Sequence, residues 1–309
     1  MIMMLNVETD CDIINQCLRA DNIEWSEIVN LITEKRELSS VVTLMKVKAP
    51  DIAKRVKAGQ FIILRVDEKG ERIPLTVAEG NPETGDVTIM FQIAGATTRK
   101  LAALNAGDYL ADFVGPLGVP TEHEGATKVC VVGGGVGNAI AYPQAKALHE
   151  AKIPVDAIIG FKTKDMVMLE DEFKAVTDNL YVTTDDGTYG IQGFVTNQLE
   201  KLIQEGAGYD LVIAIGPTPM MKFVCKVTEK YNIKTIVSLN PIMIDGTGMC
   251  GGCRVKVGGE TKFACVDGPD FDGHKVDFDE LINRNSFYKE FEKEKDEHIC
   301  RMGRNGGNN

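Results

Sequence analysis

The stretch that decides the fold runs from residue 128 to residue 148 and reads KVCVVGGGVGNAIAYPQAKAL. Its first part, Lys128 to Val132, is an apolar run of the kind found in buried β-strands. A glycine-rich loop and a helical pattern follow this strand. In a strand–loop–helix unit of this kind, the glycine backbone can come close to a diphosphate, and the backbone amides at the start of the helix stabilise its negative charge. The unit therefore predicts a dinucleotide site. Its helical pattern extends from Asn138 to Ala151, and its loop consists of Gly133, Gly134, Gly135, Val136 and Gly137.

Strands and helices alternate downstream of this loop as far as residue 231. This alternation is typical of βαβ units, which build a parallel sheet. We therefore assign residues 125–236 to a dinucleotide-binding α/β domain. The expected strands are Val155–Gly160, Leu180–Thr183 and Leu211–Gly216, and the expected helices are Leu169–Asp178, Gly193–Gln204 and Met220–Tyr231.

Two further loops follow strands of this sheet, Thr183 to Gly190 and Gly216 to Met221. Either loop alone is typical of a connecting turn, but ligands of open α/β sheets bind at the carboxyl ends of the strands. Together with the glycine loop they favour one shared ligand, held in part by Gly216 and Pro217. Asp186 is the candidate for a contact with a ribose hydroxyl, and Asp185 is the alternative.

Upstream, residues 30–124 are rich in short alternating or β-branched runs separated by Gly, Pro and Asp. The clearest runs are Val41–Val47, Phe61–Val66 and Asp86–Gln92. They predict a small antiparallel barrel. Residues 1–29 are set apart as an N-terminal extension, with a helix expected from Ile13 to Ile28.

The barrel also contains groups that could hold a flavin. Such a site needs apolar walls for the ring, a hydroxyl or amide near N5 and donors for the phosphates. Thr76 and the pair Thr97 and Thr98, expected just before a short helix, could supply the polar groups. The candidates lie in two stretches of sequence. The first, Glu71 to Thr76, contains the candidates Pro74, Leu75 and Thr76. The second, Phe91 to Arg99, contains the candidates Phe91, Gln92, Thr97 and Thr98.

Residues 237–275 are rich in loops and contain three of the eight cysteines, Cys250, Cys253 and Cys265. Plant-type ferredoxins bind a 2Fe–2S cluster with the spacing C-x4-C-x2-C and a distant fourth cysteine. On that spacing the first position is Asp245, so that the pattern becomes D-x4-C-x2-C-x11-C. We therefore expect three thiolates and one carboxylate as the ligands of a 2Fe–2S cluster.

Two other interpretations of this segment stay open. The cysteines could form a structural zinc site, although the spacing differs from that of paired zinc knuckles. Asp245 could instead cap the turn that it begins, and Cys225 or Cys300 would then be the fourth ligand. Cys130 lies in a buried-strand run and is expected to be a small core residue.

The chain is thus expected to be a mixed β and α/β protein with a small 2Fe–2S module, followed by a C-terminal helix and tail at 276–309. It has 309 residues and a formal net charge of -11, which argues against binding to nucleic acid. No apolar run approaches the roughly 20 residues that span a bilayer, and the first residues do not form a signal peptide. We therefore expect a cytoplasmic protein without a membrane partner.

With these motifs in view, the chain resembles the ferredoxin–NADP reductase superfamily from about Asn30 to Tyr288. Within it, the chain resembles the small subunit of NADH-dependent reduced ferredoxin:NADP+ oxidoreductase, an electron-bifurcating transhydrogenase also known as sulfide dehydrogenase. The electron-transfer subunit of dihydroorotate dehydrogenase is a close relative. The motifs that carry the resemblance are Gly59–Phe61, Arg72–Thr76, Gly115–Gly118, Gly133–Gly137, Thr183–Gly190 and Asn240–Cys250.

The resemblance implies a role for each motif. Pro74 to Thr76 and Thr97–Thr98 would hold FAD, and the glycine loop with Gly216–Pro217 would hold NAD(H). The cluster of the oxidoreductase subunit is bound by one aspartate and three cysteines, as Asp245 suggests here, whereas the dihydroorotate relative has four cysteines. The superfamily usually has arginine three residues before the flavin-site Ser or Thr, where this chain has Ile73. Many members also have cysteine where this chain has Ile215.

The implied function is electron transfer between NAD(H) or NADP(H), FAD and the 2Fe–2S cluster, and on to a large iron–sulfur flavoprotein subunit. Ferredoxin or hydrogenase subunits would be reached through that complex. The cofactors carry the hydride chemistry, so no catalytic side chain is expected. The alternatives are an electron-transfer subunit of dihydroorotate dehydrogenase or of a bifurcating hydrogenase, and a non-catalytic docking subunit that carries the cluster.

Overall fold

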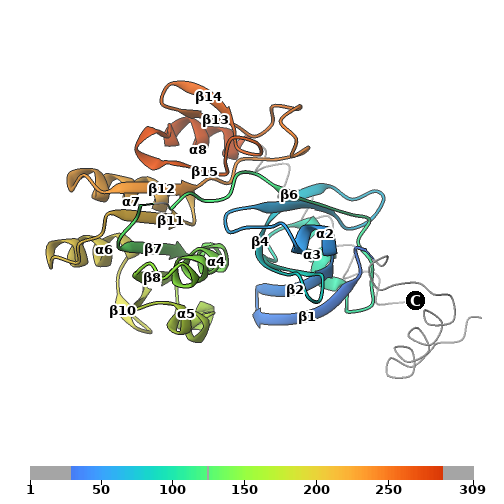
Figure 1. The fold of residues 1–309 in the computed structure, drawn as a ribbon, viewed down its shortest axis with the longest axis horizontal. Helices are drawn as coiled ribbons and strands as arrows, with labels where there is room; N and C mark the ends of the chain where they lie inside the picture. Colours follow the sequence, from blue (N-terminus) through green and yellow to red (C-terminus); the bar gives the residue numbers. More distant parts are fainter. Residues whose placement is uncertain (1–28, 124, 288–309) are drawn as a thin grey trace, which may run out of the picture.

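The computed structural model describes residues 29–123 and 125–287. Figure 1 shows an antiparallel barrel beside an α/β domain, with the C-terminal module packed at one edge of the α/β sheet. The expected helix from Ile13 to Ile28 and the residues Cys11, Cys17 and Cys300 lie outside the described residues. Among the described residues, no helix is long and apolar enough to cross a bilayer.

The barrel is a six-stranded sheet in which all neighbouring strands run antiparallel. Three backbone hydrogen bonds join the beginning of the first edge strand to the segment just before the other edge strand: Ile32 N donates to Asp108 O at 2.8 Å, Gly107 N to Ile32 O at 2.9 Å and Leu110 N to Asn30 O at 2.9 Å. The sheet therefore closes on itself, as predicted. In spatial order the strands are β1 (Ile32–Ser39), β2 (Val42–Lys48), β5 (Asp86–Gln92), β4 (Arg72–Asn81), β3 (Phe61–Arg65) and β6 (Asp112–Leu117), with short helices α2 (Pro50–Ala53) and α3 (Ala96–Ala103).

Side chains of β3 alternate between two cores, because successive residues of a strand point to opposite faces. Ile62 and Leu64 belong to the barrel interior. Phe61 and Ile63 point the other way and pack in a core shared with the α/β domain and the C-terminal module. The outer face of β3 thus joins the barrel to the rest of the chain.

The α/β domain is built on a seven-stranded sheet that is parallel apart from one edge strand. Strand order reverses between β7 and β11, which makes the gap between these two strands the switch point of a doubly wound sheet. In spatial order the strands are β10 (Ile191–Gln192), β9 (Asn179–Thr184), β8 (Val155–Phe161), β7 (Val129–Gly134), β11 (Leu211–Ile215), β12 (Lys234–Ser238) and the antiparallel β15 (Asp270–Asp272).

Helices cover both faces of this sheet. Val129 and Val131 of β7 pack with α4 (Gly137–Glu150) and α5 (Glu170–Val176) on one face. Cys130 and Val132 alternate with them and pack with α6 (Val195–Gln204) and α7 (Thr218–Lys230) on the other. Cys130 is fully buried there, as expected of a core residue. The bounds of the predicted strands and helices differ from these by a few residues, within the usual uncertainty of element ends.

The C-terminal module touches both domains. It consists of the hairpin β13 (Arg254–Val257) and β14 (Glu260–Phe263), the edge strand β15, a short 3-10 turn η3 (Gly273–Lys275) and helix α8 (Phe278–Ser286). Val255 and Ala264 pack in the same core as α6 and α7. At its other side, a Cβ placed on Gly246 would lie 2.6 Å from Ile63 Cδ1 and 2.9 Å from Leu117 Cδ1. The loop that begins at Asp245 is therefore seated directly on β3 and β6 of the barrel.

Candidate flavin, nucleotide and iron–sulfur sites

One cleft of about 990 Å³ lies between the barrel and the carboxyl end of the parallel sheet. Its volume is in the range of a cofactor site. The cleft brings together every predicted cofactor residue except Thr97, Thr98, Gly133 and Asp186. The predicted residues that line it are Pro74, Leu75, Thr76, Phe91 and Gln92 from the barrel, and Gly134, Gly135, Val136, Gly137, Gly216 and Pro217 from the α/β domain.

The glycine loop packs tightly on one side and is open on the other. A Cβ on Gly134 would lie 2.3 Å from Met220 Sδ, and one on Gly137 would lie 2.4 Å from Ile215 O. Gly135 has a φ of +58°, and a Cβ there would meet nothing within 4 Å. The loop therefore presents bare backbone to the cleft at the point where α4 begins, which fits a bound diphosphate.

Gly133 lies in β7, just before the cleft-facing part of this loop, and leaves space for the side chain of Asn138. A side chain there would collide with Asn138, whose Nδ2 donates hydrogen bonds to Gly135 O at 2.9 Å and to Gly160 O at 3.1 Å. Asn138 is fully buried and ties the loop to β8. Its role was not predicted, because the second partner lies 22 residues away in the sequence.

The loop after β9 separates the two adjacent aspartates. Asp186 accepts hydrogen bonds from Thr188 N at 3.0 Å and Thr188 Oγ1 at 2.7 Å, which hold its pKa below the ordinary value. Its carboxylate therefore stabilises the turn. Asp185, the alternative candidate, lines the cleft together with Lys162 at the end of β8.

Thr97 and Thr98 lie inside the first turn of α3 and not before it, which corrects the expected position. The Thr98 hydroxyl accepts hydrogen bonds from Ala94 N at 2.9 Å and Gly95 N at 3.0 Å, so it caps the helix. Thr97 Oγ1 donates to Glu71 at 3.1 Å. Within the barrel wall, Phe61 pairs with Thr76 across β3 and β4.

Several residues of the cleft were not predicted. Phe194 and Phe223 stand out because they are 63% and 56% exposed, an unusual state for large aromatic side chains. That exposure depends on tertiary structure, so the sequence alone gave no signal for it. Further unpredicted lining residues are Ser39, Val41, Lys162, Ser238, Asn240 and Met243.

The three cysteines of the module lie in one loop region with backbone amides turned toward sulfur. Cys253 and Cys265 are buried and Cys250 is exposed. Cys265 N donates to Cys253 Sγ at 3.4 Å, and Gly252 N donates to Cys250 Sγ at 3.4 Å. Burial, with a smaller contribution from Cys253, raises the pKa of Cys265 to about 12. Two neighbouring buried sulfurs with amide donors suit a cluster that neutralises their charge.

Within residues 29–123 and 125–287, no set of three or more His, Cys, Asp or Glu side chains is arranged to hold a single metal ion. A 2Fe–2S cluster uses two protein ligands on each iron, so a pair of ligands is the relevant unit. Cys253 and Cys265 are the two described cysteines that a hydrogen bond joins, from Cys265 N to Cys253 Sγ, and their role as such a pair stays a prediction.

Asp245 does cap the turn that it begins. Its Oδ2 accepts hydrogen bonds from Thr247 Oγ1 and from Thr247 N, the latter at 3.1 Å. These bonds, and more weakly the positive charge of Arg72, hold the pKa of Asp245 below its ordinary value. Cys225, one of the alternative ligands, is buried on α7 against Gly273, where a Cβ would lie 2.5 Å from its sulfur.

A closed antiparallel barrel that shares a cleft with a doubly wound sheet defines the class of ferredoxin reductase-like proteins. The cytochrome b5 reductase domain of Ulva prolifera nitrate reductase has this fold, with a TM-score of 0.54 and 19% identity over 65% of this chain and 91% of that chain. At that identity the likeness shows the fold alone.

The particular family follows from closer comparisons. Residues 240–277 match the family described as the iron–sulfur cluster binding domain of dihydroorotate dehydrogenase B. A homologue of the dihydroorotate dehydrogenase B (NAD(+)) electron transfer subunit from Thermotoga maritima is 47% identical over 265 residues, which are 86% of this chain and 93% of that protein. The chain belongs to the family of these electron transfer subunits and their homologues.

A solved structure is similar over almost the whole described chain. It belongs to the NADH-dependent reduced ferredoxin–NADP oxidoreductase, studied for flavin-based electron bifurcation. The TM-score is 0.83 and the identity 46%, over 88% of this chain and 98% of that chain. The predicted resemblance, fold class and electron-transfer role are thereby confirmed, and the predicted set of FAD, NAD(P)(H) and an iron–sulfur cluster agrees with these relatives. The individual ligand residues stay predictions.

Proposed function

We propose that this chain is an NAD(P)H-dependent oxidoreductase subunit that passes electrons from a nicotinamide dinucleotide through FAD and a 2Fe–2S cluster to a larger iron–sulfur flavoprotein. One observation carries the proposal: a single cleft is lined by the barrel wall and the glycine loop, and the cysteine loop is seated on that same wall. When bound, FAD would accept a hydride at N5 and pass electrons on singly.

The chain's own residues would hold and orient the two cofactors. Phe61, Pro74 and Leu75 give the flavin side of the cleft an apolar wall, and Thr76 adds a hydroxyl beside it. Gly134 to Gly137 faces this wall from the switch point of the sheet, where a dinucleotide diphosphate would bind. Both rings can then meet inside the same cleft.

The nucleotide end of the cleft favours NAD(H) over NADP(H). Lys162 offers a positive charge for the diphosphate, whereas Asp185 offers an acceptor for a ribose hydroxyl. A 2′-phosphate beside Asp185 would place two negative charges together, which is unfavourable.

Electrons would leave through the cysteine loop. Gly246 contacts Ile63, and Ile63 pairs with Pro74 of the cleft wall across β3 and β4. On the outer side of the loop, Met249 is 88% exposed and Ile244 is 57% exposed. Exposed apolar side chains beside a redox site suit contact with a partner protein, which we propose is the large iron–sulfur flavoprotein subunit.

A dihydroorotate dehydrogenase subunit is the second candidate, because the match at residues 240–277 is to that enzyme's cluster domain. Asp245, at the position where the first cysteine of the C-x4-C-x2-C spacing would stand, favours the oxidoreductase. A non-catalytic docking subunit is disfavoured by the open cleft. We also propose a cytoplasmic location, since the five described cysteines are unpaired and a reducing compartment would keep them so.

The test is purification of the full chain with its accompanying subunits in the absence of oxygen, followed by flavin, iron and sulfide analysis. We expect bound FAD, two irons per chain in this module and bleaching of the flavin by NADH. A partner that carries 4Fe–4S clusters supports the oxidoreductase, and a dihydroorotate-oxidising partner supports the second candidate. Protein without flavin that does not react with NADH or NADPH would refute the proposal.

A further inference from the structure

Two arginines of the C-terminal module reach the pair of glycines in the cysteine loop. Arg254 is the first residue of β13, and its Nη1 donates a hydrogen bond to Gly251 O at 3.1 Å. Arg284 lies on α8, and its Nη2 donates to Gly252 O at 3.1 Å. Two successive carbonyls of the loop are therefore held by guanidinium groups.

The contact made by Arg254 bears directly on a cysteine sulfur. The Gly251 carbonyl and the Gly252 N–H belong to one peptide group, which is planar and trans, so that these two bonds point in opposite directions. Gly252 N donates to Cys250 Sγ at 3.4 Å. Arg254 thus binds one side of the peptide group whose other side faces the Cys250 sulfur.

Packing alone holds this peptide group only loosely. Gly251 has a φ of +68°, in the region that favours glycine, and glycine leaves the backbone more freedom than any other residue. A Cβ on Gly251 would lie 3.6 Å from a ring atom of Phe263, and Cys250 beside it is exposed. The hydrogen bonds from the two arginines therefore restrict a segment that has few other constraints.

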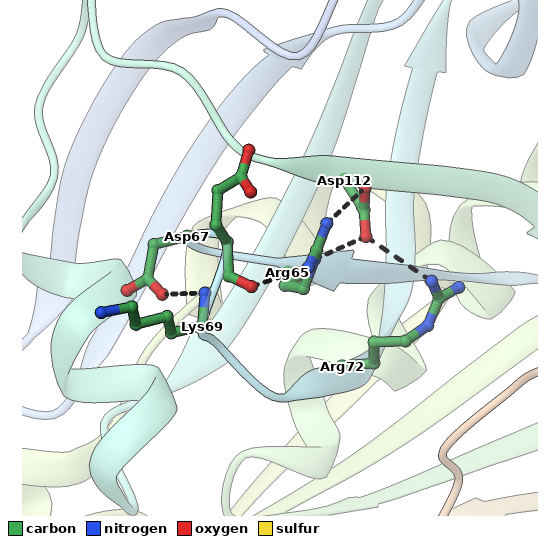
Figure 2. Close-up of polar contacts among 6 residues, drawn as sticks. Arg65, Asp67, Lys69, Arg72 and Asp112 are labelled. Atoms are coloured by element: carbon green, nitrogen blue, oxygen red, sulfur yellow. Dashed lines mark hydrogen bonds and ion pairs between the residues drawn. The ribbon is translucent and has the colours of Figure 1, made fainter.

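The partners of these arginines differ from those of Arg65 in the barrel. Figure 2 shows Arg65 with its Nε and Nη2 on the two oxygens of Asp112, at 2.7 and 3.3 Å. In the described part of the chain, neither Arg254 nor Arg284 forms an ion pair with a carboxylate. Their positive charges therefore stay beside the cysteine loop without a neighbouring acid to neutralise them.

We propose that Arg254 and Arg284 are positioning residues for the iron–sulfur cluster, which hold the two glycine carbonyls so that the Gly252 N–H stays directed at the Cys250 sulfur. This inference rests on the proposed function, because it requires the cluster. An N–H directed at a ligand sulfur stabilises the additional negative charge of the reduced state. A guanidinium on the carbonyl side strengthens that N–H donor, because linked hydrogen bonds polarise one another. Loss of the arginine therefore lowers the midpoint potential of the cluster.

The test is a redox titration of the cluster, followed by its electron paramagnetic resonance signal, in the full chain purified without oxygen. Arg254→Met keeps a long side chain but removes the charge and every donor. Lys256→Met is the matched control, since Lys256 carries the same charge two residues further along the same exposed face of β13. We expect Arg254→Met to titrate at a lower potential than the parent, and Lys256→Met to titrate like the parent.

A parental potential in Arg254→Met would overturn the inference. Equal shifts in Arg254→Met and Lys256→Met would also overturn it, because they would show that only the overall charge of the hairpin matters.

A second measurement reports on the peptide group itself. Electron–nuclear double resonance of the reduced protein, before and after exchange into heavy water, detects exchangeable amide protons close to the cluster. We expect Arg254→Met to lose or weaken one such proton coupling that the parent and Lys256→Met both keep. The same couplings in all three proteins would refute the positioning role.

Should Arg254→Met not fold or not keep its cluster, Arg284→Met is measured by the same titration. We expect a lower potential there too, since the carbonyl of the following peptide group is released, and a parental potential refutes the inference. A parent protein without any 2Fe–2S spectrum would instead refute the proposed function.

Discussion

The side chain of Asn138 occupies the space that a Cβ on Gly133 would need: the two atoms, Asn138 Oδ1 and an ideal Cβ, would be 2.0 Å apart. Position 133 must therefore be glycine because the Asn138 side chain fills the space beside it, and not because a ligand approaches it. Through Asn138, Gly133 fixes the loop that faces the cleft.

We predict that Gly133→Ala weakens both the fold and nucleotide binding, because Asn138 must leave Gly135 and Gly160. Crowding of this kind costs about 1–3 kcal/mol of unfolding free energy. Thermal unfolding and NADH titration of the flavin protein would measure the two effects. Gly95→Ala is the control, since a Cβ there meets nothing within 4 Å. Equal behaviour of the two variants would contradict the role given to Asn138.

Asp245→Ala should lose most of the iron of the module, because a carboxylate ligand is removed together with its charge. The matched variant Thr247→Val removes only the hydroxyl that Asp245 accepts in the turn, and it should keep its iron and its visible spectrum. Iron and sulfide analysis after anaerobic purification measures both. If Asp245→Ala retains the full spectrum, the aspartate is a turn cap and another residue is the fourth ligand.

Asp270 should make stability depend on pH between about 4 and 6. Burial, against hydrogen bonds from Ser238 and Thr121, raises its pKa from 3.8 to about 6. The folded chain therefore holds this proton more tightly than the unfolded chain. The protonated Asp270 carboxyl therefore adds to the free energy of unfolding, by about 3 kcal/mol at most. This contribution is fully present below pH 3.8 and is lost as the pH rises through 6.

Asp270→Asn removes this titration. We expect the difference in unfolding free energy between parent and variant to change across that window and to be flat above it. Denaturant unfolding at a series of pH values measures the difference. A difference that is constant from pH 4 to pH 7 would show that the Asp270 carboxyl titrates normally.

Asp185→Ser should relax the preference for NADH, since it removes the negative charge that opposes a 2′-phosphate. We expect the ratio of NADPH to NADH efficiency to rise roughly tenfold, or about 1.4 kcal/mol. Asp186→Ser is the internal control. Its carboxylate is held by Thr188, so this variant should leave the ratio unchanged even if the turn is loosened. If Asp186→Ser changed the ratio of NADPH to NADH efficiency more than Asp185→Ser does, Asp186 and not Asp185 would be the residue beside the ribose.

Much of the fold could be predicted because the parallel strands are buried on both faces. β8, with the sequence VDAIIGF, reads as a continuous apolar run. β1 was missed for the opposite reason: its sequence ITEKRELS is mostly polar, since much of the strand is exposed. β15 has three residues, and it exists only because β12 offers an open edge.

The cleft was predictable where backbone shape decides the chemistry, as in Gly134 to Gly137. It was not predictable where neighbours distant in sequence decide it. Two adjacent aspartates are equivalent in the sequence, and only the hydrogen bonds of Thr188 show that Asp186 faces its own turn.

The antiparallel pairing of β15 with β12 has a practical consequence for anyone who wants this flavoprotein without its metal. Cutting the chain after Ser238 would remove β15 from the nucleotide sheet and leave β12 as an exposed edge strand open to aggregation. A metal-free version is better made by exchanging individual cysteines than by truncation, because the C-terminal module contributes a strand and core side chains to the nucleotide domain.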